Sequence, residues 1–348
     1  MKKGLILLGV LVMIGAILVP AAMPASEPQA KVFKWKAQTS FAAGSLNFKG
    51  AEAAMNHLRR MTNGRLDIRC YGTGAIVASA EVTPALGKGA FEVGSYAPAY
   101  DTGLDPGLSI FFSIPSIWGI NDVREMRIWY DQFGGGKMLR EAYDKYNIYW
   151  VGPTFNGAEP IFSKVPLRKI EDFKGIKIRT IAGITADVVT RLGAKPTFIP
   201  GGDTYGALNS GVVDAAEWIS LAEDVSMGLH EVTKYVLYPS FHCPAGMTQW
   251  SVNKDTWNQL PDDLKAAFEA IIPILDINYD YWAQAADYDA LTKIKAKGLV
   301  HTQLSAEDNA KIRQISLQVT EAYKTKSPLA DKAITSIVNY LKLTGTLK

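Results

Sequence analysis

The chain has 348 residues, of which 48% are hydrophobic and 20% are charged; this composition is typical of globular proteins, and the length exceeds what one hydrophobic core usually organises. Its formal net charge of +3, from 37 basic and 34 acidic residues, lacks the basic excess of a nucleic-acid-binding protein, which argues against that class. Its two cysteines, Cys70 and Cys243, are too few for a disulfide framework, and their spacing leaves open whether they pair.

The N-terminus has the pattern of an export signal. Lys2 and Lys3 precede an uncharged, almost wholly apolar run over residues 4–23, and small residues near its end offer cleavage sites. Because the run is about as long as a membrane span, an uncleaved anchor is the alternative. We expect residues 1–26 to be a signal peptide and the mature chain to be periplasmic.

The chain then predicts alternating strands and helices. Residues 32–39 and 66–71 alternate apolar and polar side chains, as strands do, and residues 45–62 between them have amphipathic helical spacing. In the second half, KGIKIRT (174–180) has the same strand-like alternation, followed by a helical segment and a further strand near residues 196–199. This alternation predicts an α/β fold with parallel pairing.

A ten-residue pattern occurs twice. ALGKGAFEVG (85–94) and ALNSGVVDAA (207–216) both predict a helix ended by glycine and followed by a short strand, which leads to Tyr96 or Trp218. We interpret the repeat as two similar lobes facing each other across a cleft.

The C-terminal third is predicted to be helical. Residues 255–297 have few breaks apart from Pro261 and Pro273, and their recurring aromatic residues are interpreted as packing against both lobes. Amphipathic helices near residues 306–325 and 331–343 follow. These last helices could pack on their own chain or on a partner's.

Motifs of enzyme chemistry are incomplete. GTGAIV (72–77) lacks the third glycine of a dinucleotide fingerprint, and His230-Glu231 lacks the second histidine of a zinc-protease helix. The sequence contains no Gly-x-Ser-x-Gly elbow. We therefore expect that the protein is not an enzyme.

Arg179 is the strongest candidate for a binding residue. It ends a predicted strand, the position where open α/β sheets form their ligand crevice. A guanidinium there can bind a carboxylate through two parallel hydrogen bonds, and the start of the next helix favours an anion too. The sequence predicts a small organic acid as ligand; the alternative is a surface ion pair of Arg179.

Further candidates for the cleft lie elsewhere along the chain. Asn156 is a candidate second polar contact, and Tyr100, Phe41 and Trp218 are candidate walls of the pocket. Glu217 would repel an anionic ligand unless a cation lies between them, so it indicates either a bound sodium or calcium ion or a salt bridge to a neighbouring basic residue.

The chain resembles the extracytoplasmic solute receptors of tripartite ATP-independent periplasmic (TRAP) transporters, in the branch that binds 2-oxo acids and related monocarboxylates. The resemblance runs through most of the mature chain. The stretches that carry it are FFSIPSIWGIN, KGIKIRT, LGAKPTFIP, GGDTYGALNSGVVDAAEW, GLHEVTKYVLYPSFHCPAG and SVNKDTWNQLP.

The resemblance implies a two-lobed periplasmic binding protein fold with crossover strands and a long helix spanning both lobes. We expect lobe I over residues 31–155 and lobe II over residues 156–243, each with part of residues 244–300, and C-terminal helices over residues 301–348. Such a receptor closes on its ligand and delivers it to membrane permease subunits. Some relatives exchange a C-terminal helix, so a homodimer is compatible with the tail.

The resemblance also assigns roles to residues. The family's carboxylate-binding arginine falls on Arg179 and its polar loop residue on Asn156, although that branch has glutamine nearby. The pair that helps to hold a metal ion falls on Glu217 and Trp218. The branch has a third, acidic residue where this chain has Cys243, which would border the ligand and leaves the metal in question.

The leading hypothesis is the periplasmic solute-binding component of a TRAP transporter, which captures a 2-oxo or hydroxy monocarboxylate. We expect no cofactor other than a bridging sodium or calcium ion. Two alternatives remain at this point: an exported enzyme that acts on an organic acid with Glu217 as general base, and a ligand-sensing partner of a membrane receptor.

Overall fold

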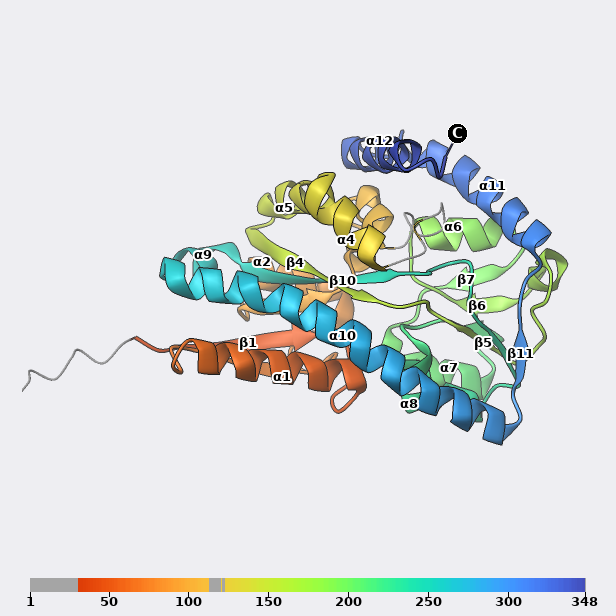
Figure 1. Ribbon diagram of the computed structural model, residues 1–348, viewed down its shortest axis with the longest axis horizontal. Helices are drawn as coiled ribbons and strands as arrows, with labels where there is room; N and C mark the ends of the chain where they lie inside the picture. The colour runs from red at the N-terminus through yellow and green to blue at the C-terminus, as the bar shows by residue number, and fades with distance from the viewer. Residues whose placement is uncertain (1–30, 113–119, 121–122, 348) are drawn as a thin grey trace, which may run out of the picture. The chain divides into compact units, whose positions relative to one another are not determined.

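The computed structural model describes residues 31–112, 120 and 123–347, so the predicted signal peptide at residues 1–26 lies outside the described part. From Val32 onward the chain forms one compact unit, built on two β-sheets with helices around them (Figure 1). Within the described residues, no helix is long and apolar enough to span a membrane. The predicted α/β class with two sheet-based lobes is confirmed.

The first sheet has the strand order β2–β1–β3–β10–β4. As predicted, β1 pairs in parallel with β2, with Phe33 opposite Leu66. The strand β10 pairs antiparallel with both β3 and β4. The strands span Phe33–Thr39 (β1), Leu66–Tyr71 (β2), Val93–Tyr96 (β3), Ile148–Asn156 (β4) and Gly246–Asn253 (β10).

The second sheet has the strand order β11–β9–β5–β8–β6–β7. The strand β6 is parallel to β7 and β8, whereas β5 is antiparallel to β8 and β9. The strands span Ile161–Ser163 (β5), Lys177–Arg179 (β6), Lys195–Thr197 (β7), Ala215–Ala216 (β8), Tyr235–Leu237 (β9) and Val300–Thr302 (β11).

The repeated ten-residue pattern corresponds to equivalent places in the two sheets. The helix α2 (Val82–Gly87) leads to β3, and α7 (Thr204–Ser210) leads to β8. The strand β3 lies between parallel β1 and antiparallel β10, and β8 lies between parallel β6 and antiparallel β5. Gly211, which ends α7, has φ +78°, a conformation that favours glycine.

Two segments carry the chain directly from one sheet to the other. Residues 157–160 connect β4 to β5, and residues 238–245 connect β9 back to β10. The two crossings are tied together because the backbone N–H of Glu159 donates to the carbonyl oxygen of Cys243 at 2.9 Å. The side chains of these crossings are therefore held close to each other.

The long helix α10 (Asp262–Lys297) packs against β4 and against the helices α1 (Leu46–Met61) and α8 (Leu221–Ser226) (Figure 1). The break predicted at Pro273 is wrong, because the helix continues through it. An interior proline removes one helical hydrogen bond, but Ile271, Ile272 and Leu275 around it are fully buried against the first sheet's core. The free energy gained by burying these neighbours exceeds the cost of the hydrogen bond lost at Pro273.

Asp276 fixes α10 to the first sheet. It is 3% exposed, accepts a hydrogen bond from the backbone N–H of Phe155 at 2.7 Å and forms an ion pair with Arg127. Replacing Asp276 with alanine is expected to destabilise the fold by about 3–5 kcal/mol, because it leaves a partly buried guanidinium and a buried N–H without their partner. Urea denaturation of Asp276→Ala, with the more exposed Asp280→Ala as control, measures this difference in the free energy of unfolding.

The C-terminal helices α11 (Ala306–Tyr323) and α12 (Pro328–Leu343) pack on their own chain. The helix α11 contacts α6 (Ile184–Arg191), and α12 contacts α5 (Gly135–Asp144). The remaining helices are Val123–Gln132 (α4) and Lys254–Asn258 (α9), with 3₁₀ turns at Ser79–Glu81 (η1), Pro98–Asp101 (η2), Pro106–Ser109 (η3), Ile170–Phe173 (η4), Gly201–Asp203 (η5) and Leu229–Glu231 (η6).

Candidate functional site

A small cavity lies between residues at the carboxyl ends of strands from both sheets. Arg179 is the last residue of β6, Asn156 is the last residue of β4, and Glu217 directly follows β8. Open α/β sheets bind their ligands at such strand ends. The free space is about 20 Å³, little more than one water molecule needs, so an organic acid can enter only if the walls move apart. The wall also includes Ser40, Phe41, Tyr100, Phe112, Trp218 and Thr248.

Arg179 is the central cationic group of this cavity. Its side chain is 1% exposed, so the alternative of a surface ion pair is wrong. Its Nε donates to the carbonyl oxygen of Ile199 at 2.9 Å, and its Nη1 donates to the carbonyl oxygen of Glu217 at 2.6 Å and lies 3.0 Å from Glu217 Oε2. Its Nη2 is buried and has no hydrogen-bond partner among the described residues. A buried donor without a partner costs free energy, and a ligand oxygen that accepts from Nη2 would remove this cost.

Two aromatic residues surround this guanidinium. The Trp218 ring lies 4.8 Å from the Arg179 carbon Cζ, which is a cation–π distance. Tyr100 packs edge-on against Phe198 with ring centroids 5.4 Å apart. Burial raises the pKa of Tyr100 to about 12, although the charge of Arg179 opposes the shift, so the hydroxyl is neutral and able to donate.

The Trp218 ring packs closely against Gly201. A Cβ atom at position 201 would lie 2.0–2.4 Å from three carbons of the indole, whereas one at Gly202 would meet only a Thr73 methyl at 3.5 Å. We expect Gly201→Ala to destabilise the fold by about 1–3 kcal/mol, because the ring must shift. Urea denaturation checks the prediction, and Gly202→Ala is the matched control; equal effects of the two substitutions would contradict it.

Glu217 is buried and bonded on both carboxylate oxygens. Its Oε1 accepts from the backbone N–H of Ile181 at 2.8 Å, and its Oε2 faces Arg179 Nη1 at 3.0 Å and His242 Nε2 at 4.0 Å. The salt bridge foreseen from the sequence is therefore present, with Arg179 as the partner. Glu217 holds one side of the guanidinium and leaves Nη2 open.

Glu159 is a site residue that sequence reasoning missed. It lies on the first crossing between the sheets, is fully buried, and its Oε1 has no hydrogen-bond partner among the described residues. Its Oε1 would be 2.7 Å from a Cβ at Gly246, so glycine at that position makes room for the carboxylate. Burial and then the charge of Glu217 raise the pKa of Glu159 well above its ordinary range.

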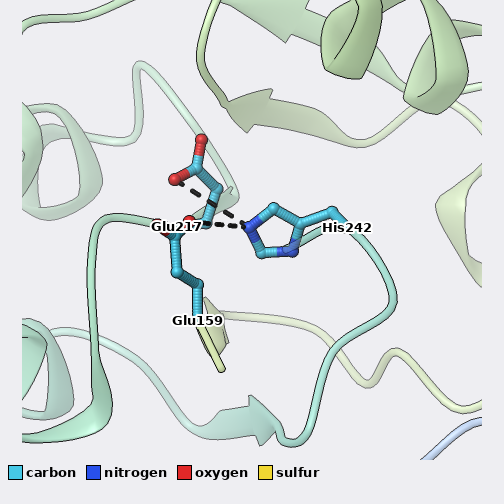
Figure 2. Close-up of side chains that lie close together, drawn as sticks. All are labelled: Glu159, Glu217 and His242. Atoms are coloured by element: carbon cyan, nitrogen blue, oxygen red, sulfur yellow. Dashed lines mark hydrogen bonds and ion pairs between the residues drawn. The ribbon is translucent and has the colours of Figure 1, made fainter. Parts of the chain in front are cut away.

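His242, on the second crossing, faces both glutamates through Nε2 (Figure 2). The Ser240 hydroxyl donates to the carbonyl oxygen of Glu159 at 2.7 Å and lies 2.5 Å from His242 Nδ1. Because a hydroxyl has one proton, Nδ1 must be the donor to Ser240, and burial lowers the pKa of His242 to about 4. Nε2 of the neutral ring therefore presents a lone pair to Glu159 Oε2 at 3.2 Å.

The buried acidic groups around the cavity favour a bound cation. Glu159, Glu217 and His242 each offer a ligand atom, and these atoms lie within 4.8 Å of one another. Asp224, also fully buried, adds a third carboxylate near the single guanidinium of Arg179. Buried acids in excess of their basic partners, together with the unpartnered Glu159 Oε1, fit a metal ion that prefers carboxylate oxygen ligands.

The structure brings most of the predicted site residues together. Arg179, Asn156, Tyr100, Phe41 and Trp218 all line the cavity, along with Glu217.

Cys243, which was expected to border the ligand, is not among the residues that line this cavity. Cys243 is fully buried in a cluster with Ala97, Phe112 and Ile181, which do line the cavity, and a Cβ at Gly246 would lie 3.1 Å from its sulfur. Cys70 and Cys243 are both free thiols, so they do not pair.

Comparisons with known proteins agree with the fold. The sequence pattern of the bacterial extracellular solute-binding proteins of family 7 matches residues 37–326. A monocarboxylate 2-oxoacid-binding periplasmic protein of Nostoc sp. is 29% identical over 294 residues, which cover 84% of this chain and 80% of the relative. A C4-dicarboxylate-binding periplasmic protein of Rhodobacter capsulatus is 27% identical, covering 75% of this chain and 78% of the relative.

Several solved structures with the same fold have a bound metal ion. A TRAP transporter solute-binding protein of Bordetella bronchiseptica has a TM-score of 0.83 and 26% identity, covering 90% of this chain and 93% of its own; it is a mixed-occupancy dimer with calcium and picolinate in one active site. A TRAP periplasmic solute-binding protein of Colwellia psychrerythraea, with bound calcium and pyruvate, has a TM-score of 0.81 and 25% identity, covering 89% and 94%.

Proposed function

Because the chain belongs to the bacterial extracellular solute-binding proteins of family 7, we propose that it captures a small organic acid, a 2-oxo or hydroxy monocarboxylate, in the cavity around Arg179. The observation that carries the proposal is the buried Nη2 of Arg179, a residue that lines this cavity; Nη2 has no hydrogen-bond partner among the described residues. A carboxylate supplies the acceptor and the negative charge that this donor lacks. The relative from Nostoc sp., named for 2-oxoacid binding, supports this class of ligand.

The wall residues suit a short, polar ligand. Asn156 is 7% exposed at the end of β4 and offers an amide to a second oxygen of the acid. The neutral Tyr100 hydroxyl is a further donor, and Phe41 and Trp218 supply apolar walls. These four residues would orient the acid, while Arg179 supplies most of the affinity.

The proposal includes a cation beside the acid. Glu217 and Glu159 would hold it through carboxylate oxygens, with His242 Nε2 as a further ligand. Trp218 is the other residue that the resemblance assigns to the metal. Two carboxylates favour calcium over sodium. The cation would offset the charge of Glu217, which otherwise repels an anionic ligand. Glu159 would thus supply the acidic metal ligand that the related branch has at the position of Cys243.

We propose that capture is not followed by chemistry. Both carboxylate oxygens of Glu217 are engaged, by the Ile181 N–H and by Arg179, so Glu217 is a poor general base. The matched family consists of solute-binding proteins. The chain would act in the periplasm after removal of residues 1–26 and deliver its ligand to the membrane permease subunits of a TRAP transporter.

Ligand entry requires opening, since the free space is only about 20 Å³. We propose lobe I over residues 31–155 and lobe II over residues 156–243, each completed by part of residues 244–300, with residues 301–348 bracing both. The two crossings would act as the hinge between the lobes. The site residues Asn156, Glu159 and His242 lie on or beside these crossings. Closure would then bury the acid with the guanidinium.

A thermal-shift screen tests the function. The exported chain is heated with pyruvate, lactate and longer 2-oxo acids in sodium-free buffer, with added calcium, added sodium or EDTA. We expect a monocarboxylate to raise the midpoint, most strongly with calcium, since a ligand at 100 times its Kd stabilises by about 2.7 kcal/mol.

Pyruvamide is the matched control for the ligand, because it has the same shape without the carboxylate charge. It should leave the melting midpoint unchanged. A protein stabilised equally by pyruvate and pyruvamide, or by no carboxylate at millimolar concentration, would refute the proposed ligand class.

A further inference from the structure

The first turn of α1 is capped by a side chain of α8, which lies far from it in the sequence. Glu223 Oε2 accepts a hydrogen bond from the backbone N–H of Asn47 at 3.4 Å, across 176 positions of the chain. The same carboxyl group accepts from the backbone N–H of Leu46 and from the Ser45 hydroxyl. The first N–H groups of an α-helix have no partner within the helix. Glu223 therefore supplies acceptors that α1 itself lacks.

This cap is shielded from water. Glu223 and Asn47 are both 1% exposed, so water does not replace the carboxyl group as acceptor in this arrangement. Burial raises the pKa of Glu223, although its bonds to Ser45 and to the two N–H groups oppose the shift. Because the charged and the neutral carboxyl group both accept hydrogen bonds, the cap depends on an acceptor oxygen rather than on a charge.

The helix α6 is capped in the reciprocal direction. Its N-cap residue, Gly183, has no side chain with which to cap it, and the backbone N–H of Ile184 donates to Ser109 Oγ at 3.4 Å. Ser109 is 1% exposed and lies in η3, within the first of the two lobes proposed above. The second lobe thus caps a helix of the first, and the first lobe caps a helix of the second.

The two capped helices occupy equivalent places in the two sheets. The strand β1 pairs in parallel with β2 and β3, and β6 pairs in parallel with β7 and β8. The helix α1 follows β1, and α6 follows β6. The two caps are therefore counterparts, one on each side of the gap between the sheets.

The contact at α6 also requires a glycine. Gly183 has φ +89°, and a Cβ atom at this position would lie 2.5 Å from the Cβ of Ser109 and 2.9 Å from the Cγ2 of Thr102. Atoms this close would have to move apart, so any larger residue at position 183 would push the two lobes away from each other.

The cap on α1 is coupled to the ligand cavity through apolar packing. Phe48, in the first turn of α1, belongs to one buried cluster with Phe41, Trp218 and Ile219. The last three of these residues line the cavity around Arg179. The capped end of α1 therefore packs against the same side chains that would enclose the acid.

We propose that Glu223 and Ser109 hold the lobes closed as a reciprocal pair of helix caps. The inference rests on the lobes and the closing movement of the proposed function. In the open form water takes the place of both acceptors, and on closure each lobe completes a helix of the other. Glu223 and Ser109 are not among the residues that line the cavity. They set the affinity through the closed fraction of the protein, without touching the acid.

Titration of the exported chain with pyruvate in calcium buffer tests the cap on α1. We expect Glu223→Ala to weaken binding about tenfold, since the loss of a helix cap costs on the order of 1 kcal/mol. The dissociation rate of pyruvate, measured by stopped flow, should rise by the same factor while the association rate stays unchanged, because the cap forms after entry. Glu223→Gln retains an acceptor oxygen and should bind within threefold of the parent.

The cap on α6 is tested by Ser109→Ala. We expect a loss of affinity of similar size, which adds to that of Glu223→Ala in the double variant because the two caps serve different helices. Ser305→Ala is the matched control, since Ser305 caps α11 from the adjoining residue, accepting from the Asp308 N–H at 3.0 Å. It should lower the unfolding midpoint and leave the affinity for pyruvate unchanged.

Gly183→Ala separates the closing contact from backbone strain. Its control is Gly193→Ala, because Gly193 has a similar φ of +91° and a Cβ there would meet only Lys174 of the same lobe, at 3.4 Å. Both substitutions strain the backbone and should lower the unfolding midpoint. Only Gly183→Ala should weaken pyruvate binding, by more than tenfold, because its Cβ holds the lobes apart.

Parent-like affinity and dissociation rate in both Glu223→Ala and Gly183→Ala would overturn the proposal. If pyruvate does not bind to the parent, the proposed ligand is wrong, and small-angle X-ray scattering of the ligand-free chains decides on the caps. We then expect a larger radius of gyration for Glu223→Ala and Gly183→Ala than for the parent and for Gly193→Ala. Equal radii for all four chains would overturn the proposal in that case.

Discussion

Replacing Arg179 with lysine is expected to weaken pyruvate binding by roughly 100-fold, about 2.7 kcal/mol, while the chain still folds. Lysine retains the positive charge beside Glu217 but has no second nitrogen to place where Nη2 lies. The planar guanidinium is held through Nε by Ile199 and through Nη1 by Glu217, which leaves Nη2 buried without a hydrogen-bond partner among the described residues. Isothermal titration calorimetry of the variant in calcium buffer measures the loss.

Lysine is a better probe than alanine at this position. Arg179→Ala would leave Glu217 buried without its cation, at a cost of about 3–5 kcal/mol to the fold, so binding and folding would be lost together. Arg191→Lys is the matched control, since Arg191 is exposed on α6 and, within the described part of the chain, its side chain hydrogen-bonds only to Gln318. An Arg179→Lys affinity within threefold of the parent would remove Nη2 from the binding site.

Glu159→Gln is expected to abolish the part of ligand stabilisation that depends on calcium, with calcium affinity reduced on the order of 100-fold, because one of two carboxylate ligands is lost. Glutamine has nearly the same shape, and burial already favours the uncharged form of Glu159, so the fold should persist without metal. The measurement is the thermal midpoint with pyruvate in calcium and in EDTA.

The Cys243→Ser substitution tests whether Cys243, rather than Glu159, binds the metal. Glu159 lines the cavity and Cys243 does not, so the serine variant of Cys243 should keep the full calcium response. Loss of the response in Cys243→Ser and its retention in Glu159→Gln would reverse the assignment.

Local sequence patterns were sufficient to predict much of the fold. The strands at residues 32–39 and 66–71 have period-two alternation and no competing signal, and they pair as expected. Helix limits were less well predicted. The break assumed at Pro273 is absent because Ile271, Ile272 and Leu275 pack into the core, a tertiary effect that a local proline rule does not include.

In the site, too, local sequence patterns predict some residues, whereas tertiary contacts decide the others. Arg179 and Trp218 could be placed because each follows directly from its position at a strand end. Glu159 and His242 are 83 residues apart and meet only because the two crossings pair through the Glu159 N–H and the Cys243 carbonyl. Glu159 lies three residues after the candidate Asn156, and His242 lies in the stretch GLHEVTKYVLYPSFHCPAG. No local periodicity indicates which side chains of these segments turn inward.

A crystal structure of the exported chain with pyruvate and calcium tests the central claim most directly. The account predicts a carboxylate oxygen within hydrogen-bonding distance of Arg179 Nη2 and a cation bound by Glu159 and Glu217. Pyruvate bound away from this cavity, or an Arg179 Nη2 still without a partner in a pyruvate-saturated crystal, would contradict it.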